Sequence, residues 1–201
     1  MEVDFFLFRH GQTDWNLEQR CQGSTDIPLN HTGIEQAKGL AEFMKDIHLD
    51  VVFSSHLKRA HETAKIITES KKIPLIVEKD LRETFFGEME GKFMTDIVSH
   101  VGEDFWNSFR DFENTDPNLS LPGGETRGSV VERMSGVLDK IILEGQYKSV
   151  GISTHGSALV NLLRLFWDRS QGFPYIGNCS LFHLKYNRES GFKEVTLLNQ
   201  D

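Results

Sequence analysis

An apolar run, residues 3–8, ends directly in Arg9, His10 and Gly11. A guanidinium can hold a phosphoryl group or a carboxylate through two hydrogen bonds at once, and a neutral imidazole can attack phosphorus. Glycine lets the backbone turn away and leave the preceding imidazole exposed. A buried strand that ends in these three residues therefore indicates a site that holds an anion and attacks it.

Two further candidates follow other segments that suit buried strands. Arg59 comes shortly after residues 51–54, and His155 comes directly after residues 148–154. Because ligands bind beyond the carboxyl ends of strands in open α/β sheets, we expect these side chains to converge at one edge. We also expect the helix that begins at Gly156 to offer backbone N–H groups to an anion.

The loop after the segment 73–78 is expected to supply an acid that protonates a leaving oxygen and later activates water. Three glutamates stand there, Glu83, Glu88 and Glu90. Residue chemistry alone leaves the choice among them open.

Strand-type and helix-type segments alternate along the chain. Continuous apolar runs predict strands buried on both faces, and apolar residues at helical spacing predict the helices between them. The predicted strands cover residues 3–8, 51–54, 73–78, 148–154, 179–186 and 192–198. The predicted helices begin at a capping box formed by Thr32 and Glu35, and at residues 57, 126 and 156. This alternation predicts an α/β fold with three layers, α/β/α, and a mostly parallel sheet with an antiparallel edge formed by the terminal hairpin.

We expect residues 1–201 to form a single domain with a helical lid insertion at about residues 92–122. Apolar side chains of this lid could line a pocket for a leaving group, although their helical spacing favours ordinary core packing: Phe93, Met94, Phe105, Trp106, Phe109 and Phe112.

The charges of the lid are mostly negative. Two cations, Lys92 and Arg110, stand against six acids: Asp96, Glu103, Asp104, Asp111, Glu113 and Asp116. We expect such a lid to repel a second phosphate group.

The composition excludes several function classes. The net charge of −8, from 22 basic and 30 acidic residues, argues against nonspecific binding to nucleic acid or to an acidic membrane. No apolar run approaches the roughly 20 residues of a membrane span, and the first residues do not resemble a signal peptide, so we expect a cytoplasmic protein. Cys21 and Cys179 are expected to be free thiols, and the spacing of the histidines does not predict a metal site.

Taken together, the motifs resemble those of the histidine phosphatase superfamily, which has the phosphoglycerate-mutase-like fold. The matching segments follow the family's order and cover residues 7–16, 22–33, 53–64, 81–91, 122–126 and 153–157. Met89 departs from the pattern, because the family often has Trp there.

The resemblance implies a role for each candidate residue. His10 would be the phosphorylated nucleophile and Glu83 the proton donor. The phosphoryl group would be bound by Arg9, Arg59, His155, Asn16 and Gln22, and we place Gly23 and Gly156 in the same binding set. The resemblance further implies that no metal and no organic cofactor takes part.

The leading hypothesis is a metal-independent phosphomonoester hydrolase that acts on small organic phosphates through a phosphohistidine. A cofactor-dependent phosphoglycerate mutase is the alternative. A catalytically inactive module that binds a phospho-ligand is disfavoured, because such a module should have lost His10 or Arg59, and both are present. The expected partner is a small-molecule phosphate ester, and the sequence predicts no oligomeric state.

Overall fold

The computed structural model describes residues 2–199 and contains a six-stranded sheet with the strand order β3-β2-β4-β1-β5-β6. The strands are β1 (Glu2–Arg9), β2 (Val51–Ser54), β3 (Leu75–Val77), β4 (Ser149–Thr154), β5 (Leu181–Asn187) and β6 (Gly191–Leu197). The first four run parallel to one another, and β5 and β6 form an antiparallel hairpin at one edge. The predicted mixed sheet with an antiparallel edge is confirmed.

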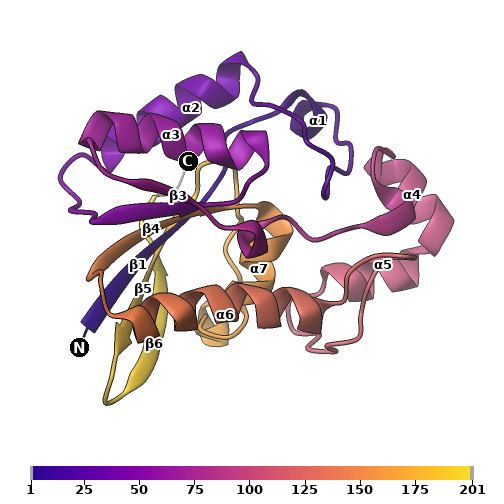
Figure 1. The fold of residues 1–201 in the computed structure, drawn as a ribbon. Helices are drawn as coiled ribbons and strands as arrows, with labels where there is room; N and C mark the ends of the chain where they lie inside the picture. The colour runs from indigo at the N-terminus through magenta and orange to yellow at the C-terminus, as the bar shows by residue number, and fades with distance from the viewer. Residues whose placement is uncertain (1, 200–201) are drawn as a thin grey trace.

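Helices cover both faces of this sheet. They are α1 (Asp14–Leu17), α2 (His31–Phe43), α3 (Lys58–Lys71), α4 (Met94–Val101), α5 (Glu103–Arg110), α6 (Arg127–Glu144) and α7 (Gly156–Leu163), with short 3₁₀ turns η1 (Lys79–Leu81), η2 (Gly87–Met89) and η3 (Arg169–Gln171). Figure 1 shows α2 and α3 on one face and α6 and α7 on the other, which confirms the predicted three layers.

The central strand β1 shows why a continuous apolar run forms a strand here. Phe6 and Phe8 pack in the cluster that includes side chains of α2 and α3. Phe5 and Leu7 pack in the cluster that includes side chains of α6 and α7. Because successive side chains of a strand point to opposite faces, a strand between two helical layers needs apolar residues at every position.

Several predicted boundaries differ from the structure. Helix α2 begins at His31 with Asn30 as its N-cap, whose side chain accepts from Gly33 N–H at 2.9 Å, so the predicted capping box at Thr32 is wrong. Either residue could have capped the helix, and Asn is among the strongest N-cap residues. Strand β3 covers only Leu75–Val77 of the predicted residues 73–78. Helix α7 begins at Gly156 and ends at Leu163, and Phe166 and Trp167 pack against the core from the loop that follows.

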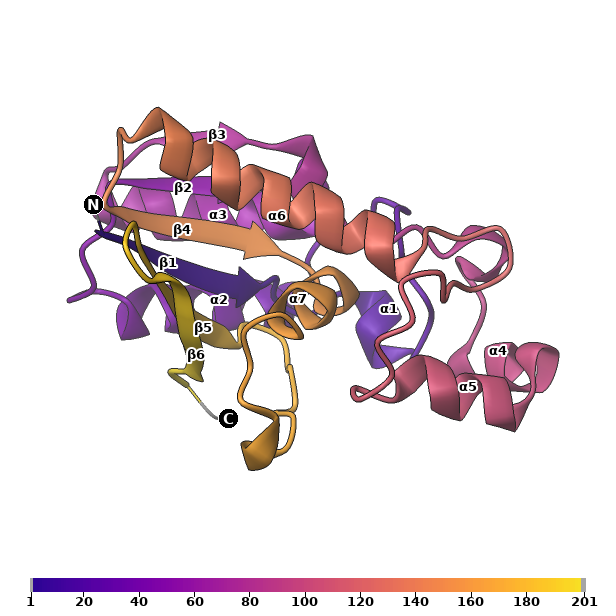
Figure 2. The same cartoon turned by 90° about the horizontal axis from the view of Figure 1, so that it is seen from below.

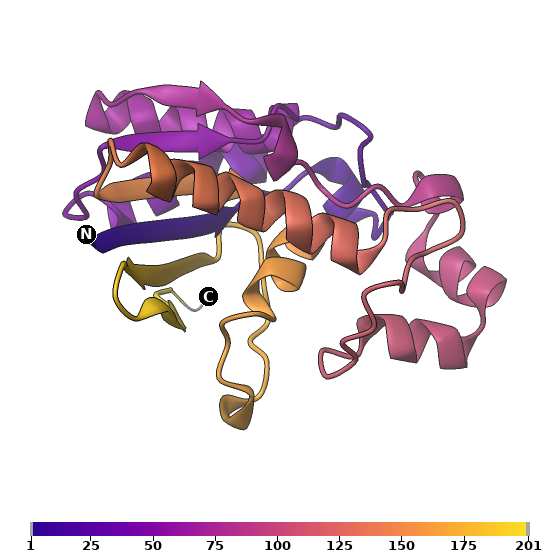
Figure 3. The ribbon, with the colours of Figure 1, turned by 60° about the horizontal axis from the view of Figure 1, so that its bottom comes forward.

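The lid segment carries α4 and α5. Figures 2 and 3 show both helices beyond the carboxyl ends of β1 and β4, on the side of the molecule where α1 lies. Most of the lid's apolar side chains pack on a small cluster of their own around Cys21, Met89, Ile97 and Leu121. The lid therefore has its own core and is placed at the sheet edge where the site was expected.

Candidate active site

Eight of the nine predicted site residues line one cavity of about 400 Å³ at the carboxyl ends of the strands. They are Arg9, His10, Asn16, Gln22, Gly23, Arg59, Glu83 and Gly156. The ninth, His155, does not line the cavity, but its ring centre lies 5.2 Å from that of His10. The structure thus brings together residues that are up to 147 positions apart in the chain, from Arg9 to Gly156.

His10 is buried and held as one tautomer. Its Nδ1 lies 2.7 Å from the carbonyl oxygen of Gly11, and since a carbonyl can only accept, Nδ1 must carry the proton. Nε2 is then the nitrogen with the free electron pair. Burial lowers the pKa of His10 well below 6.5, and the charges of Arg59 and Arg9 lower it further. The imidazole is therefore neutral and able to act as a nucleophile.

Gly11 serves close packing rather than an unusual turn. A Cβ at this position would lie 2.3 Å from the carbonyl oxygen of Gly33 in α2, so only glycine allows this approach. The backbone N–H of Gly11 donates to Thr63 Oγ1 at 3.1 Å. The sequence analysis predicted that Gly11 would leave His10 exposed. Instead His10 is only 2% exposed.

Arg59, at the start of α3, is fully buried and fixed by three hydrogen bonds. Its two terminal nitrogens donate to the carbonyls of Gly23, at 2.7 Å, and Thr25, at 2.8 Å. Its Nε donates to His155 Nδ1 at 3.2 Å. Burial lowers the pKa of Arg59 to about 10, so the guanidinium stays charged at neutral pH.

His155 is engaged through both ring nitrogens. Because a guanidinium can only donate, Nδ1 of His155 must accept from Arg59, and Nε2 must carry the proton that it donates to Ser55 Oγ at 2.8 Å. Burial and the charge of Arg59 lower the pKa of His155 well below 6.5. In this arrangement His155 orients Arg59, and its predicted direct contact with a phosphoryl group stays a prediction.

Polar groups without partners face this cavity from several sides. Arg9 donates one terminal N–H to the Ile176 carbonyl at 2.8 Å, while its Nε is buried without a partner in the described chain. Gln22 is 8% exposed, and its amide oxygen is also unpartnered among the described residues. Asn16 accepts from Thr13 through Oδ1, which leaves its Nδ2 available as a donor. Since buried unpaired polar groups are costly, such a set is typical of a ligand site.

Glu83 is held by the start of α7. Its carboxylate accepts from the backbone N–H groups of Thr84 at 2.8 Å, Ser157 at 3.1 Å and Ala158 at 2.8 Å. The prediction that the amides at this helix start would hold the ligand is therefore wrong for Ser157 and Ala158, because the protein's own carboxylate occupies them. Gly156 allows close packing of the Arg9 side chain, since a Cβ at this position would lie only 3.3 Å from Arg9 Nε.

Geometry separates the three glutamates that residue chemistry left open. Only Glu83 lines the cavity. Glu90 accepts from Ser24 N–H at 2.7 Å and from the Thr25 hydroxyl at 2.9 Å, so it anchors the loop whose carbonyls hold Arg59. Gly23 in that loop has φ +54°, and a Cβ there would lie 2.0 Å from Glu90 Oε1. Glu88 is exposed.

The sequence analysis missed two positioning residues. Ser55 fixes the tautomer of His155, and its place in the Ser-Ser-His segment after β2 was a usable signal. Asn178 donates to the His10 carbonyl at 3.0 Å and to Asn16 Oδ1 at 3.2 Å. Nothing in the sequence around residue 178 distinguishes it from an ordinary loop asparagine.

The charge pattern of the cavity differs from the predicted one. Four arginines line it, Arg9, Arg20, Arg59 and Arg110, and within the described chain Glu83 is the one carboxylate among the lining residues. The six acids of the lid are all exposed and do not line the cavity. The expectation that the lid would repel a second phosphate is therefore wrong at the cavity wall, because the acids of α4 and α5 and those of the loop that follows α5 point to solvent.

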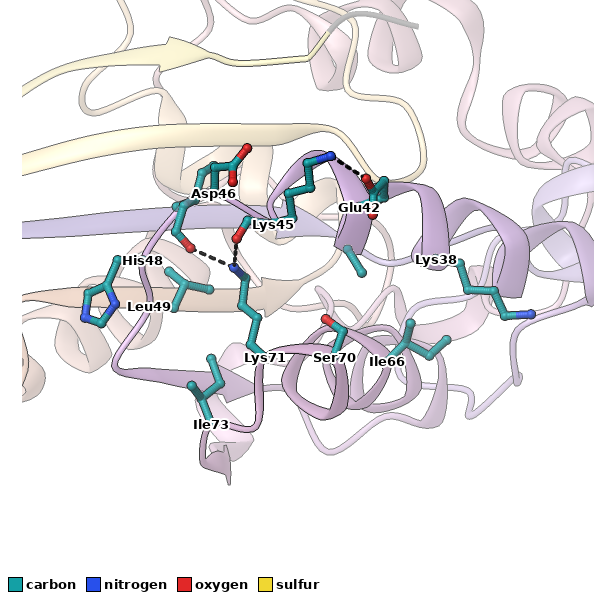
Figure 4. Close-up of a pocket in the computed structure, with 12 residues that line it drawn as sticks. Lys38, Glu42, Lys45, Asp46, His48, Leu49, Ile66, Ser70, Lys71 and Ile73 are labelled. Carbon is teal, nitrogen blue, oxygen red and sulfur yellow. Dashed lines mark hydrogen bonds and ion pairs between the residues drawn. The ribbon is translucent and has the colours of Figure 1, made fainter.

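A larger groove, of about 780 Å³, lies between the ends of α2 and α3 (Figure 4). Several of its charged groups have partners: Lys45 pairs with Glu42 at 2.7 Å, and Lys71 Nζ donates to the carbonyls of Lys45 and Ile47. It contains none of the predicted site residues. Size alone thus does not mark the chemical site.

Two features are absent from the described residues, 2–199. No group of three or more His, Cys, Asp or Glu side chains there is arranged to hold a metal ion. Within the same range, no helix has the length and apolar character needed to cross a membrane.

Comparison with known proteins agrees with this geometry. The model of the histidine phosphatase superfamily (branch 1) matches residues 5–200. The chain is 39% identical over 157 residues to the uncharacterized phosphatase PhoE of Bacillus subtilis, covering 78% of this chain and 74% of that one. It is 30% identical over 198 residues to a broad-specificity phosphatase of Saccharomyces cerevisiae, covering 94% and 81%.

Among solved structures, a mycobacterial glucosyl-3-phosphoglycerate phosphatase complexed with VO3 superposes with a TM-score of 0.85. The identity is 25%, and the match covers 99% of this chain and 100% of the other. Proteins named as phosphoglycerate mutases also match, at 30 to 32% identity. A family model that spans nearly the whole chain, together with relatives above 30% identity, establishes that this protein is a member of the histidine phosphatase superfamily.

Proposed function

We propose that the protein hydrolyses phosphate monoesters of small organic molecules through a phosphohistidine at His10. The observation that carries this proposal is the state of His10. Its Nδ1–H is held by the Gly11 carbonyl at 2.7 Å, so that Nε2 is the free nucleophilic nitrogen in a cavity with Arg9 and Arg59. Two cations and one neutral imidazole match a phosphoryl group that must be both held and attacked.

In the first step, Arg9, Arg59, Asn16 and Gln22 hold the phosphoryl group, and His10 Nε2 attacks phosphorus. The bond from phosphorus to the ester oxygen breaks, and the protonated carboxyl of Glu83 gives its proton to that oxygen. Oε1 of Glu83 accepts two backbone N–H bonds and Oε2 only one, so Oε2 keeps an electron pair that can carry this proton.

In the second step, Glu83 takes a proton from water, which attacks phosphorus. The bond from phosphorus to Nε2 breaks, inorganic phosphate leaves, and both His10 and Glu83 return to their starting states. Positive charge for the phosphoryl oxygens comes from the two arginines, so neither a metal nor an organic cofactor is required.

The proposal is tested by trapping the intermediate. We expect rapid quenching with ³²P-labelled substrate to place label on His10, in a bond that is labile to acid and stable to base. The His10→Ala variant should neither label nor turn over, while His48→Ala, which removes an exposed histidine, should behave as the unmodified protein. Label on an acid-stable serine would contradict the proposal.

A phosphoglycerate mutase is the second candidate, and one observation favours it. Arg20 and Arg110 line the cavity in addition to the two arginines assigned to the phosphoryl group, and either could hold a second anion. The two functions are distinguished by supplying 3-phosphoglycerate with and without 2,3-bisphosphoglycerate and measuring the products. Bisphosphate-dependent formation of 2-phosphoglycerate with little release of inorganic phosphate would favour the mutase.

A further inference from the structure

The cavity continues well beyond the phosphoryl end. Its outer walls are largely apolar and include Met94, Phe112, Val160, Phe173, Pro174 and Ile176. A second cavity, of about 630 Å³, adjoins it through shared residues that include Arg110 and Tyr175, and adds Val98 and Trp106. We call this continuous outer space the leaving-group trough. Its walls would suit an elongated apolar group far better than a small polar one.

Three of the four arginines along these two cavities already have a role or a partner. Arg9 and Arg59 face the phosphoryl end. Arg20 pairs with Glu18 at 3.3 Å, and its guanidinium lies 5.2 Å from the ring centre of Trp15.

Arg110 is different. Its side chain is exposed, and in the described chain its one recorded side-chain contact is with the ring of Trp106, at 5.9 Å. Among the described residues that line the two cavities, Glu83 at the phosphoryl end is the one carboxylate. A smaller third cavity that Arg110 also lines contains Glu125, which pairs with Arg133 at 2.8 Å. Arg110 is therefore an exposed cation at the trough wall with no recorded ion pair among the described residues.

The backbone around Arg110 is fixed in place. Arg127 of α6 donates to the carbonyls of Phe109 and Asn114. Arg164, directly after α7, donates to the carbonyls of Asp111 at 3.1 Å and Phe112 at 3.3 Å. Arg127 and Arg164 thus hold the backbone on both sides of Arg110, and we call this pair the lid clamp.

The clamp is reinforced by stacking. The ring of Phe112 lies against that of Phe173, with centres 3.6 Å apart. The backbone that carries Arg110 is therefore held in place, so a ligand group that pairs with its side chain does not first have to order the loop.

We propose that the preferred substrate is the phosphate monoester of an elongated, largely apolar alcohol that carries an anionic group at its far end. The apolar body would lie along the trough, and the anionic group, a carboxylate or a second phosphate, would pair with Arg110. This inference rests on the proposed phosphatase function and names the class of leaving group that it acts on.

The test uses a matched series of alkyl phosphates. Hexyl phosphate, 6-phosphooxyhexanoate, hexane-1,6-diol bisphosphate, 6-aminohexyl phosphate and ethyl phosphate differ only in length and in the charge of the far end. We expect kcat/KM to be at least about tenfold higher for the anionic hexyl esters than for the aminohexyl ester, which corresponds to the strength of one partly screened ion pair. Hexyl phosphate should exceed ethyl phosphate by a similar factor, because added methylene groups are buried.

Variants assign the preference to Arg110. Arg110→Gln should bring the ratio between the anionic and aminohexyl esters close to one, and Arg110→Glu should invert it. Arg188→Gln removes an equal charge from the exposed turn between β5 and β6 and should leave the ratio unchanged. The ratio is an internal comparison within each variant, so a partial loss of folded protein does not affect it. Whichever anionic ester is faster identifies the far group as carboxylate or phosphate.

The outcomes of this test distinguish a failure of the substrate inference from a failure of the proposed phosphatase function. If nitrophenyl phosphate and the alkyl esters are hydrolysed but the charge preference is absent, or survives in Arg110→Gln, this inference is overturned and the phosphatase function stands. If none of these esters, nitrophenyl phosphate included, is hydrolysed by the unmodified protein, the proposed function fails and the inference fails with it.

Discussion

Glu83 has two features that matter for the role of proton donor proposed above. It is 7% exposed, and it stands at the cavity wall with its oxygens fixed by three backbone N–H groups. Under the proposed function, a carboxyl fixed in this way would deliver its proton to one place, the oxygen that leaves when His10 attacks. How much the reaction needs this proton depends on how stable the departing oxygen is without it.

We therefore expect Glu83→Gln to affect poor leaving groups most. With an alkyl phosphate the loss of kcat should be about a hundredfold or more, the usual scale of general acid catalysis, and with nitrophenyl phosphate it should be much smaller. Steady-state rates on both substrates measure the difference. Equal losses on the two would mean that Glu83 only binds or positions, and that the proton comes from elsewhere.

Among the elements, the loop at residues 22–25 decides how Arg59 is presented. Two carbonyls of this loop hold the terminal nitrogens of Arg59, and Glu90 holds the loop in turn. The carboxylate of Glu90 thus positions Arg59 without lining the cavity, and under the proposed function it would support phosphate binding. Its influence passes through backbone atoms, which a survey of side chains in the cavity would overlook.

Glu90→Gln should accordingly weaken binding of inorganic phosphate, by about tenfold if one charge-assisted hydrogen bond is lost. The matched control is Glu88→Gln. Glu88 is exposed on the same turn, and its replacement removes the same charge. Calorimetric titration with inorganic phosphate gives the dissociation constant for each variant. If Glu88→Gln and Glu90→Gln weaken binding alike, the effect is general electrostatics and the loop has no special part in it.

The elements also show which parts of the structure a sequence can predict. The run at residues 3–8 identified β1 because both faces of that strand are covered by helices, which demands apolar residues throughout. Convergence of Arg9, His10 and Arg59 followed from strand direction alone. The partner of the first amides of α7 could not be predicted, because a carboxylate more than 70 residues away, Glu83, competes with the ligand for them.

The lid illustrates the same limit. Its composition predicted an acidic wall, yet which helix face meets the cavity depends on how α4 and α5 pack against Cys21, Met89 and Leu121. That packing places Arg110 at the cavity and the acids outside. A count of charges in a segment therefore predicts its overall field but not the field inside the site.

At the scale of the whole molecule, two buried histidines couple folding to pH. The pKa values of His10 and His155 both lie well below 6.5 in the folded state, mainly through burial. As the pH falls below 6.5, the unfolded chain takes up protons at these positions while the folded chain does not, so the folded state loses stability. Each histidine contributes up to about 1.4 kcal/mol per pH unit in this range.

Urea unfolding between pH 7 and 5 measures this loss. Replacing His155 with Gln should make the decline in the free energy of unfolding shallower, even if the variant is less stable at pH 7. His48→Gln changes an exposed histidine and serves as the control. An unchanged slope in His155→Gln would show that this histidine is not kept neutral by the fold.

A second prediction at this scale concerns metals. Under the proposed function, positive charge for the phosphoryl group is supplied by the half-buried Arg9 and the buried Arg59, both covalently part of the chain. Treatment with EDTA followed by gel filtration should therefore leave kcat and KM for nitrophenyl phosphate unchanged. A large loss that zinc or magnesium restores would contradict the roles given to these arginines.

The lid clamp has a consequence for how this molecule could change over evolutionary time. Arg127 and Arg164 tie the segment around Arg110 to α6 and to the end of α7, whereas the proposed nucleophile His10 follows β1 and Arg59 stands at the start of α3. In the proposed reaction, the first step would involve both regions, because the alcohol is still attached when His10 attacks. The second step would involve the phosphohistidine, water and Glu83, but not the clamped segment. Substitutions in that segment would therefore select a new alcohol while the rate of dephosphorylation stays constant, so that specificity could change over evolution without changes to the catalytic residues.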